Sequence, residues 1–279
     1  GACFLGSKVL SFDRIVERKS GLLRQLDAFD FSRRRIHILT KTNVIRRNQI
    51  MLGYGLDPTM IVIIPALLLS MWAQHKVQST FSEYSKIPAR GNVTADSVAR
   101  MLLTLYGMAN MPINHVAGNL TDHYDPRNKT LNLSDGVYGN RSIASIGVAA
   151  HEVGHAIQHH ESYSPLIFRN TIVPVVNICS TASMPLFILG LVVGNFMLVN
   201  IGIMLFTGAL VFHLVTLPVE INASSRALKL LEQTHTLSPD ELSGARKVLT
   251  AAAWTYIAAA LMSLLQLVRL ILISRSRRR

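Results

Sequence analysis

Two long apolar stretches lie back to back in this chain: IVPVVNICSTASMPLFILGLVVG at Ile172–Gly194 and FMLVNIGIMLFTGALVFHLVTL at Phe196–Leu217. An α-helix needs roughly 20 apolar residues to cross a bilayer, and both stretches reach that length. Neither contains Asp, Glu, Lys or Arg, and only Asn195 clearly separates them. The sequence therefore predicts a tight transmembrane helical hairpin.

Two further apolar stretches flank the hairpin. Ala251–Ile273 is long enough to span, whereas Met60–Ala73 is short, carries Pro65 and reaches spanning length only with its flanks. Charged residues make up 16% of the 279 residues, against about 25% in a typical soluble domain. Any one stretch could be a buried helix of a soluble protein, but the four together predict a multi-pass integral membrane protein.

The motif His151-Glu152-Val153-Gly154-His155 precedes the hairpin. On an α-helix, residues four apart lie one turn apart on one face, so both imidazoles can reach a single Zn²⁺. Glu152 lies beside the first imidazole, where its carboxylate can take a proton from metal-bound water. Ser142 or Asn140 could cap the start of this helix. The small Gly154 lets another segment approach the metal face closely.

A catalytic zinc site needs a third protein ligand and keeps one position for water. Glu220 is the predicted ligand, because a carboxylate at the end of an apolar run is costly unless something pairs with it. Two membrane crossings separate it from the motif, so both lie on the same side. The alternative is an interfacial carboxylate paired with Arg226 or Lys229.

Other candidate ligands fit less well. His159 shares the helix face of the motif, but it lies eight residues from the first imidazole, about 12 Å along the axis, and is read as a packing or surface residue. Asp122 or His123 stays open as a ligand or transition-state stabiliser. His213 could share the face of the third ligand, but Pro218 is expected to disturb that register.

The polar region before the motif is predicted to be a small α+β, zincin-like unit. Thr94 could cap a helix over Ala95–Tyr106. Asn119–Tyr124 and Lys129–Ser134 are predicted to be short strands, and residues 125–128 carry the turn chemistry of a hairpin. Such a hairpin beside the motif helix could present an edge strand to an extended peptide.

The expected division of the chain has six parts. They are a basic, flexible N-terminal extension (1–50), a first transmembrane segment (51–75), the zincin-like catalytic region (76–170), the transmembrane hairpin (171–218), a helical segment carrying the third ligand (219–250), and a fourth transmembrane segment with a basic tail (251–279). The chain begins with Gly1, so the extension belongs to a fragment or processed protein, or it precedes a natural start such as Met51.

The basic residues are unevenly placed. Eleven of the 28 Lys and Arg residues precede residue 51, and four lie in the last five positions, which suits contact with anionic lipid. The basic stretches lack interleaved aromatic residues, so no nucleic-acid partner is expected. Basic residues near the spans number seven on one side and eight on the other, which leaves the side of the active site open. The oligomeric state is open as well.

Several motifs resemble those of YugP-type bacterial membrane zinc metallopeptidases. The resemblance covers roughly residues 58–274 and implies a multi-pass protein of the bacterial cell membrane with neutral zinc metallopeptidase activity. The matching segments are His151–Gln158, Ser142–Ile146, Asp122–Arg127, Leu133–Asp135, Leu217–Glu220, Asn222–Leu228 and Gly244–Leu249.

A more distant similarity links the chain to the CAAX-prenyl-protease and HtpX-like membrane gluzincins. In those families a glutamate after transmembrane segments is the third zinc ligand, which matches Glu220. An aspartate four residues later supports the ligands, whereas this chain has Ser224 there. The resemblance implies that Asn222 or Arg226 could take over this support.

The combined prediction is a membrane-embedded metalloendopeptidase that cuts peptide or membrane-protein substrates. One Zn²⁺ is held by His151, His155 and Glu220, and Glu152 is the general base. Donors for the oxyanion remain open among Tyr124, His123 and Arg226. The main alternative is a catalytically silent zinc-binding scaffold of the same fold. A metal transporter fits poorly, because His213 is nearly alone among ionisable residues within the spans.

Overall fold

The computed structural model describes residues 58–278, and residues 62–278 form one compact unit. The predicted N-terminal extension lies outside the described residues. The elements in chain order are η1 (Pro58–Ile63), α3 (Ile64–Tyr84), α4 (Ala95–Leu105), β1 (Ile113–Val116), β2 (His123–Asp125), β3 (Thr130–Ser134), α5 (Ile143–His160), α6 (Ser164–Val193), α7 (Phe196–Gln233) and α8 (Pro239–Arg278).

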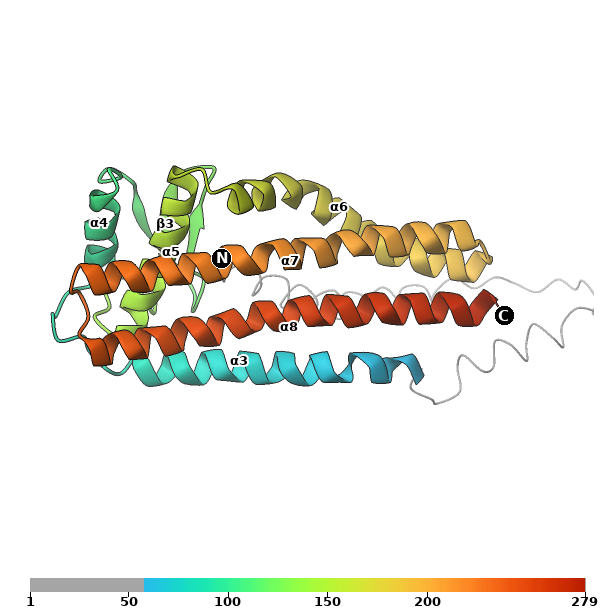
Figure 1. Cartoon of the computed structure of the whole chain (residues 1–279), viewed down its shortest axis with the longest axis horizontal. Coiled ribbons are helices and arrows are strands. Elements are labelled where there is room, and N and C mark those ends of the chain that lie inside the picture. Colours follow the sequence, from blue (N-terminus) through green and yellow to red (C-terminus); the bar gives the residue numbers. More distant parts are fainter. Residues whose placement is uncertain (1–57, 279) are drawn as a thin grey trace, which may run out of the picture. The chain divides into compact units, whose positions relative to one another are not determined.

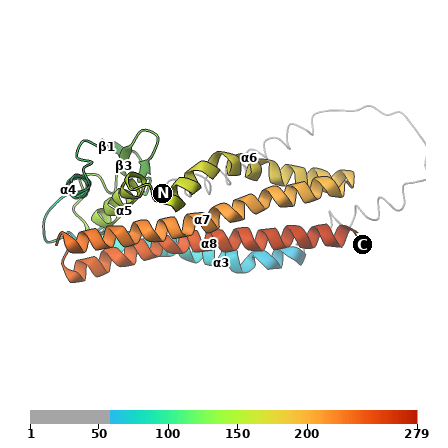
Figure 2. The ribbon, with the colours of Figure 1, turned by 45° about the horizontal axis from the view of Figure 1, so that its top comes forward.

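Four helical stretches are long and apolar enough to cross a membrane: η1 with α3, and α6, α7 and α8. Helix α3 packs along α8, α8 packs along α7, and α7 pairs with α6 (Figures 1 and 2). The small helices and the sheet gather at one end of these long helices (Figure 1). The predicted class, a mainly α multi-pass membrane protein with a small α+β region, is confirmed.

The predicted hairpin is present as α6 and α7. Gly194 ends α6 with a positive φ of 73°, and Asn195 caps α7 by accepting a hydrogen bond from the Met197 N–H at 3.0 Å. The helices cross closely because Gly202 has no side chain: a Cβ atom there would lie 2.8 Å from the Ser183 carbonyl oxygen. The two membrane crossings are therefore tightly packed near the hairpin tip.

Pro218 was expected to disturb the helical register between His213 and Glu220, but the helix does not break there. Helix α7 is 38 residues long and runs through this proline, so the span and the third-ligand segment are one helix. A proline removes only one backbone hydrogen bond, and transmembrane helices tolerate that loss when neighbouring groups compensate. Glu220 is thus carried on the same rigid element as the hairpin.

The small sheet has the strand order β1-β3-β2. Strands β2 and β3 form the predicted antiparallel hairpin, with Tyr124 opposite Leu131. The first predicted strand begins four residues too early, because Leu120 has a left-handed φ of 55° and Asp122 turns inward. Strand β1 pairs with β3 in parallel and was not predicted. Its four residues include exposed polar side chains and carry no clear alternation.

Helix α5, which carries the motif, lies at the centre of the compact end. It contacts α4, α7, α8 and two strands, and most of its residues are buried. The Ser142 hydroxyl caps it by accepting a hydrogen bond from the Ser145 N–H at 3.2 Å. Its apolar side chains form the core with those of α4 and α7, so α5 is fixed from several sides. Core members from the three helices include Leu102, Leu103, Ile146, Val153, Ile157 and Leu231.

Candidate metal centre

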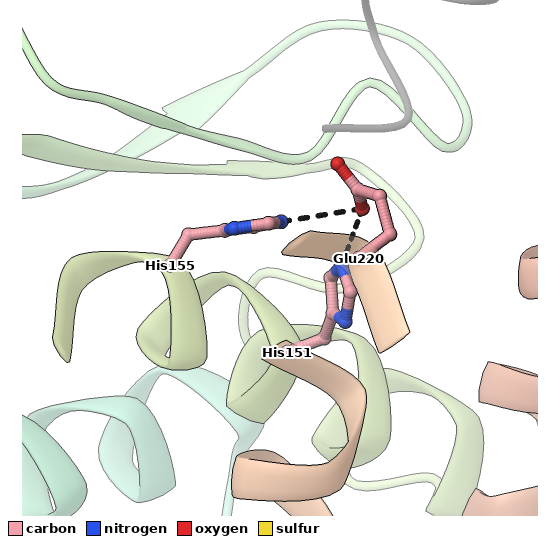
Figure 3. Close-up of side chains that lie close together, drawn as sticks. All are labelled: His151, His155 and Glu220. Atoms are coloured by element: carbon pink, nitrogen blue, oxygen red, sulfur yellow. Dashed lines mark ion pairs between the residues drawn. The ribbon is translucent and has the colours of Figure 1, made fainter. Parts of the chain in front are cut away.

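Three of the predicted site residues come together at one point. The Nε2 atoms of His151 and His155 lie 3.4 and 3.3 Å from the same oxygen, Oε2 of Glu220. Figure 3 shows the two rings rising from α5 toward the carboxylate carried by α7. Glu220 is 1% exposed and His155 3%, so water cannot satisfy these atoms freely.

Two of the three ligand separations fit a tetrahedral zinc site, and all three ligand atoms lie within 4.8 Å of one another. Ligand bonds of about 2.1 Å at tetrahedral angles place two ligand atoms about 3.4 Å apart, which matches both measured separations. The Nε2 atom of His155 and the Oε2 atom of Glu220 are buried and have no hydrogen-bond partner among residues 58–278. Buried polar atoms without partners are rare, and a shared cation would satisfy both. His151, His155 and Glu220 are therefore suited to hold a metal ion.

The tautomer of His155 follows from its neighbour Gln158. The Gln158 amide nitrogen donates to the Val219 carbonyl and to Asn222 Oδ1, both at 2.9 Å. The amide oxygen of Gln158 must therefore face Nδ1 of His155, at 3.0 Å, and accept its proton. With the proton on Nδ1, the lone pair of Nε2 points toward Glu220. This is the arrangement a metal ligand needs.

His151 is oriented by Ser224, which stands where the CAAX-prenyl-protease and HtpX-like families have an aspartate. The Ser224 hydroxyl lies 3.0 Å from Nδ1 of His151. Its place four residues after Glu220 puts both side chains on one face of α7. Ser224 thus occupies the supporting position itself, and Asn222 acts on the other imidazole through Gln158. Arg226 binds Glu161 and Asn222 and does not contact either imidazole.

Two residues beside the third carboxylate escaped the sequence analysis. Arg169 on α6 places a guanidinium nitrogen 3.2 Å from Oε1 of Glu220. Tyr256 on α8 lies near the same carboxylate. Arg169 could have been predicted as a partner, because it is a single charged residue just before an apolar run. No feature of the sequence distinguishes Tyr256. Glu220 therefore contacts side chains from α5 and α6, and the predicted alternative partners Arg226 and Lys229 do not bind it.

Glu152 is 1% exposed and lies close to the cluster. Its Oε2 atom accepts a hydrogen bond from the Tyr124 backbone N–H at 2.9 Å, so edge strand β2 is tied to the motif helix. The expected role of Gly154 is also clear. A Cβ atom there would lie 2.6 Å from the Ala223 carbonyl oxygen, so only glycine lets α7 approach this closely.

The remaining polar candidates lie outside the three-residue cluster. Asp122 is buried and accepts hydrogen bonds from the backbone N–H and the hydroxyl of Ser134, both at 2.7 Å. Burial raises its pKa above the ordinary value. The His123 ring contacts the Thr121 carbonyl and the Asn132 side chain within the sheet region. Within the described part of the chain, His213 is also absent from the group of potential ligands.

His159 and Tyr124 form a pair next to the site. The Tyr124 hydroxyl lies 2.7 Å from Nδ1 of His159. Burial, with a smaller contribution from Asp125, raises the pKa of Tyr124 to about 12. Burial lowers the pKa of His159, with Lys129 acting in the same direction. At neutral pH the pair is therefore a phenol that donates its proton to an uncharged imidazole.

Long apolar helices around a motif helix with a third carboxylate define a class: multi-pass membrane proteins with an HExxH motif and residues that could hold a metal ion. A family described as "Putative neutral zinc metallopeptidase" matches residues 59–275, and the chain belongs to this family. The chain is similar to "Putative membrane protease YugP" of Bacillus subtilis (strain 168), with 48% identity over 214 residues, 77% of this chain and 95% of that relative. No solved structure matches the chain.

Proposed function

We propose that this protein is a membrane-embedded, zinc-dependent metalloendopeptidase. The observation that carries the proposal is the cluster of His151, His155 and Glu220, in which both imidazole Nε2 atoms lie 3.3–3.4 Å from one carboxylate oxygen. The hydrogen bonds that occupy both Nδ1 atoms support it. Membership in a zinc metallopeptidase family adds the same expectation for the reaction class.

In the proposed reaction, His151, His155 and Glu220 hold the zinc ion. When bound, zinc acts as a Lewis acid that lowers the pKa of a water molecule to about 7. Glu152 takes the proton of the attacking water and passes it to the leaving amine. The Tyr124 N–H fixes the orientation of the Glu152 carboxylate for both transfers. The buried surroundings strengthen these charge interactions because water does not screen them.

Strand β2 is the proposed support for an extended substrate. It lies at an edge of the sheet, and the Tyr124 N–H points to Glu152 instead of a neighbouring strand. A peptide that adds to this edge would run beside the general base. The three oxyanion candidates stay open, because the single proton of the Tyr124 hydroxyl is already donated to Nδ1 of His159.

The test is cleavage of a degenerate peptide library by the purified protein, with zinc and with a chelator. The protein should bind one zinc ion and cut peptides, and the chelator should abolish cutting. Glu152→Gln should retain zinc and lose cleavage, because its amide oxygen can still accept the Tyr124 N–H but cannot take a proton. Equal zinc content with no cleavage by the wild-type protein would favour the scaffold alternative.

A further inference from the structure

The membrane boundary on the side of the site is marked by two tryptophans. Trp72 on α3 and Trp254 on α8 contact each other edge-on, with ring centroids 5.4 Å apart. Both are partly exposed on the outside of the helices, at 46% and 38%. Tryptophan is enriched where a membrane meets water, since its ring is apolar and its N–H polar. The pair therefore indicates the level of the lipid headgroups.

The candidate metal centre lies at this same level. Tyr256, which lies near the Glu220 carboxylate, is only two residues from Trp254, about 3 Å along α8. Glu220 itself lies three residues beyond the apolar run that ends at Leu217, about 4.5 Å along α7. Arg169 is likewise three residues before the run that begins at Ile172. Three helices thus place the site within one turn of the apolar layer.

The surface beside the site is apolar as well. Ile167 and Phe168 directly precede Arg169 on α6, and they are 44% and 52% exposed. They lie outside the long apolar run of α6, so spanning the membrane does not require them. Neighbouring exposed apolar side chains at a polar boundary commonly mark a binding surface. They suit a partner segment that is itself apolar and lies at the membrane surface.

We propose that the substrates are membrane-anchored polypeptides, cut in the segment next to their own transmembrane helix. This inference rests on the proposed function and names its substrate class. A peptide bond must enter the headgroup layer to reach the site. The segment beside a transmembrane anchor is always at that depth, whereas a soluble peptide must first partition into the layer. Anchoring in the same bilayer also raises the effective concentration of the substrate at the site.

The experiment uses the full chain, zinc-loaded and reconstituted in liposomes. The probe is a synthetic apolar helix of about 20 residues, followed by a degenerate tail of about 30 residues. Mass spectrometry of the products locates the cuts. Cuts should fall within about six residues of the anchor, roughly 20 Å of extended chain. The same tail library without the anchor should be cut at least tenfold more slowly. Cuts spread evenly along the tail, or equal rates without the anchor, would overturn the proposal.

Glu152→Gln in the same liposomes gives the background and separates the two possible failures. If the wild-type protein cuts the unanchored library as fast as the anchored one, the peptidase assignment stands and the substrate class is wrong. If neither library is cut above background, the peptidase assignment is wrong. Energy transfer between the labelled probe and labelled Glu152→Gln protein then tests whether the anchored probe binds at the apolar surface beside the site. Tighter binding of the anchored probe supports it, and equal binding of both probes refutes it.

Discussion

Ser224 shows how a neutral side chain can support a metal ligand. A hydroxyl at 3.0 Å from Nδ1 of His151 can accept its proton and fix the ring. A carboxylate in that place would also make the imidazole more basic, so the hydroxyl supplies orientation with less charge. The orientation of the two imidazoles therefore depends on hydrogen bonds that they donate to Ser224 and Gln158, and these can be tested separately from the candidate ligands themselves.

Ser224→Ala should weaken zinc binding by about 10- to 100-fold, because His151 loses the contact that orients it. Competition with a calibrated zinc chelator measures the change. The matched control is Ser225→Ala, the same substitution at the next position of α7, where the side chain is exposed. That control should bind zinc like the wild-type protein. Equal affinity of all three proteins would show that Ser224 has no supporting role.

Asp122 makes a prediction about pH. Burial raises its folded-state pKa, so the folded protein holds this proton more tightly than the unfolded chain does. Its favourable contribution is therefore complete below the unfolded pKa of about 3.9 and is lost as pH rises through the folded pKa. Asp122→Asn avoids that loss and can still bind Ser134. Relative to the wild-type protein, it should gain melting temperature as pH rises from about 4 to 7.

Asp122→Ala is the contrasting variant. It leaves the buried N–H and hydroxyl of Ser134 without an acceptor, which should cost about 1–3 kcal/mol of stability at any pH. If the asparagine variant is as unstable as the alanine variant at pH 7, the charge of Asp122 stabilises the fold and the prediction is wrong.

Much of the residue-level site could be predicted from the sequence, but its supporting contacts could not. The motif spacing and the position of Glu220 after two membrane crossings predicted the three side chains that the structure places together. Arg169, Tyr256 and Gln158 act through contacts between helices far apart in sequence. No local pattern encodes such contacts, since they depend on how the helices are rotated against one another.

At the scale of elements, the approach of α5 to α7 decides the geometry of the site. Gly154→Ala would put a methyl group 2.6 Å from the Ala223 carbonyl oxygen, so the helices must move apart. Because Glu220 is carried on α7, separation should reduce zinc affinity at least tenfold and cost about 1–3 kcal/mol of stability. Thermal denaturation and zinc titration measure both effects.

The control for that variant is Gly208→Ala, within α7. A Cβ atom at Gly208 meets only the Cys179 Cβ atom, at an ordinary 3.9 Å. This substitution should leave zinc affinity unchanged and should not destabilise the protein, since alanine favours a helix more than glycine does. A Gly154→Ala protein that behaves like the Gly208→Ala protein would contradict the close approach of α5 and α7.

The elements themselves were predicted with uneven success. Long apolar runs and the Asn195 boundary predicted the hairpin, because composition alone defines such spans. The sheet was harder: β1 and β2 have four and three residues, and pairing with β3 rather than any internal pattern stabilises them. Pro218 led to the opposite error: a disturbed helix was predicted, but α7 is continuous. The helix-breaking tendency of proline is outweighed where a helix is packed along its length.

At the scale of the whole molecule, a bound metal would join α5 to α7, the second helix of the hairpin. Removing zinc should therefore lower the melting temperature of the entire compact unit, not only loosen the site. At free zinc of about a thousand times Kd, the loss corresponds to about 4 kcal/mol. Glu220→Gln should show little dependence on chelator. An identical melting temperature with and without zinc for the wild-type protein would contradict a shared metal.

The placement of Glu220 beyond the hairpin has a consequence for biosynthesis. While the ribosome has delivered only α5, the two imidazoles lack their carboxylate partner, and a nascent chain at that stage is one donor short of the proposed centre. The partner emerges only after α6 and the apolar part of α7 have been made, and it meets the imidazoles once these two helices have been inserted as a pair. In the proposed centre, metal loading would therefore follow insertion of the α6–α7 pair, and hydrolytic competence would not arise before that stage.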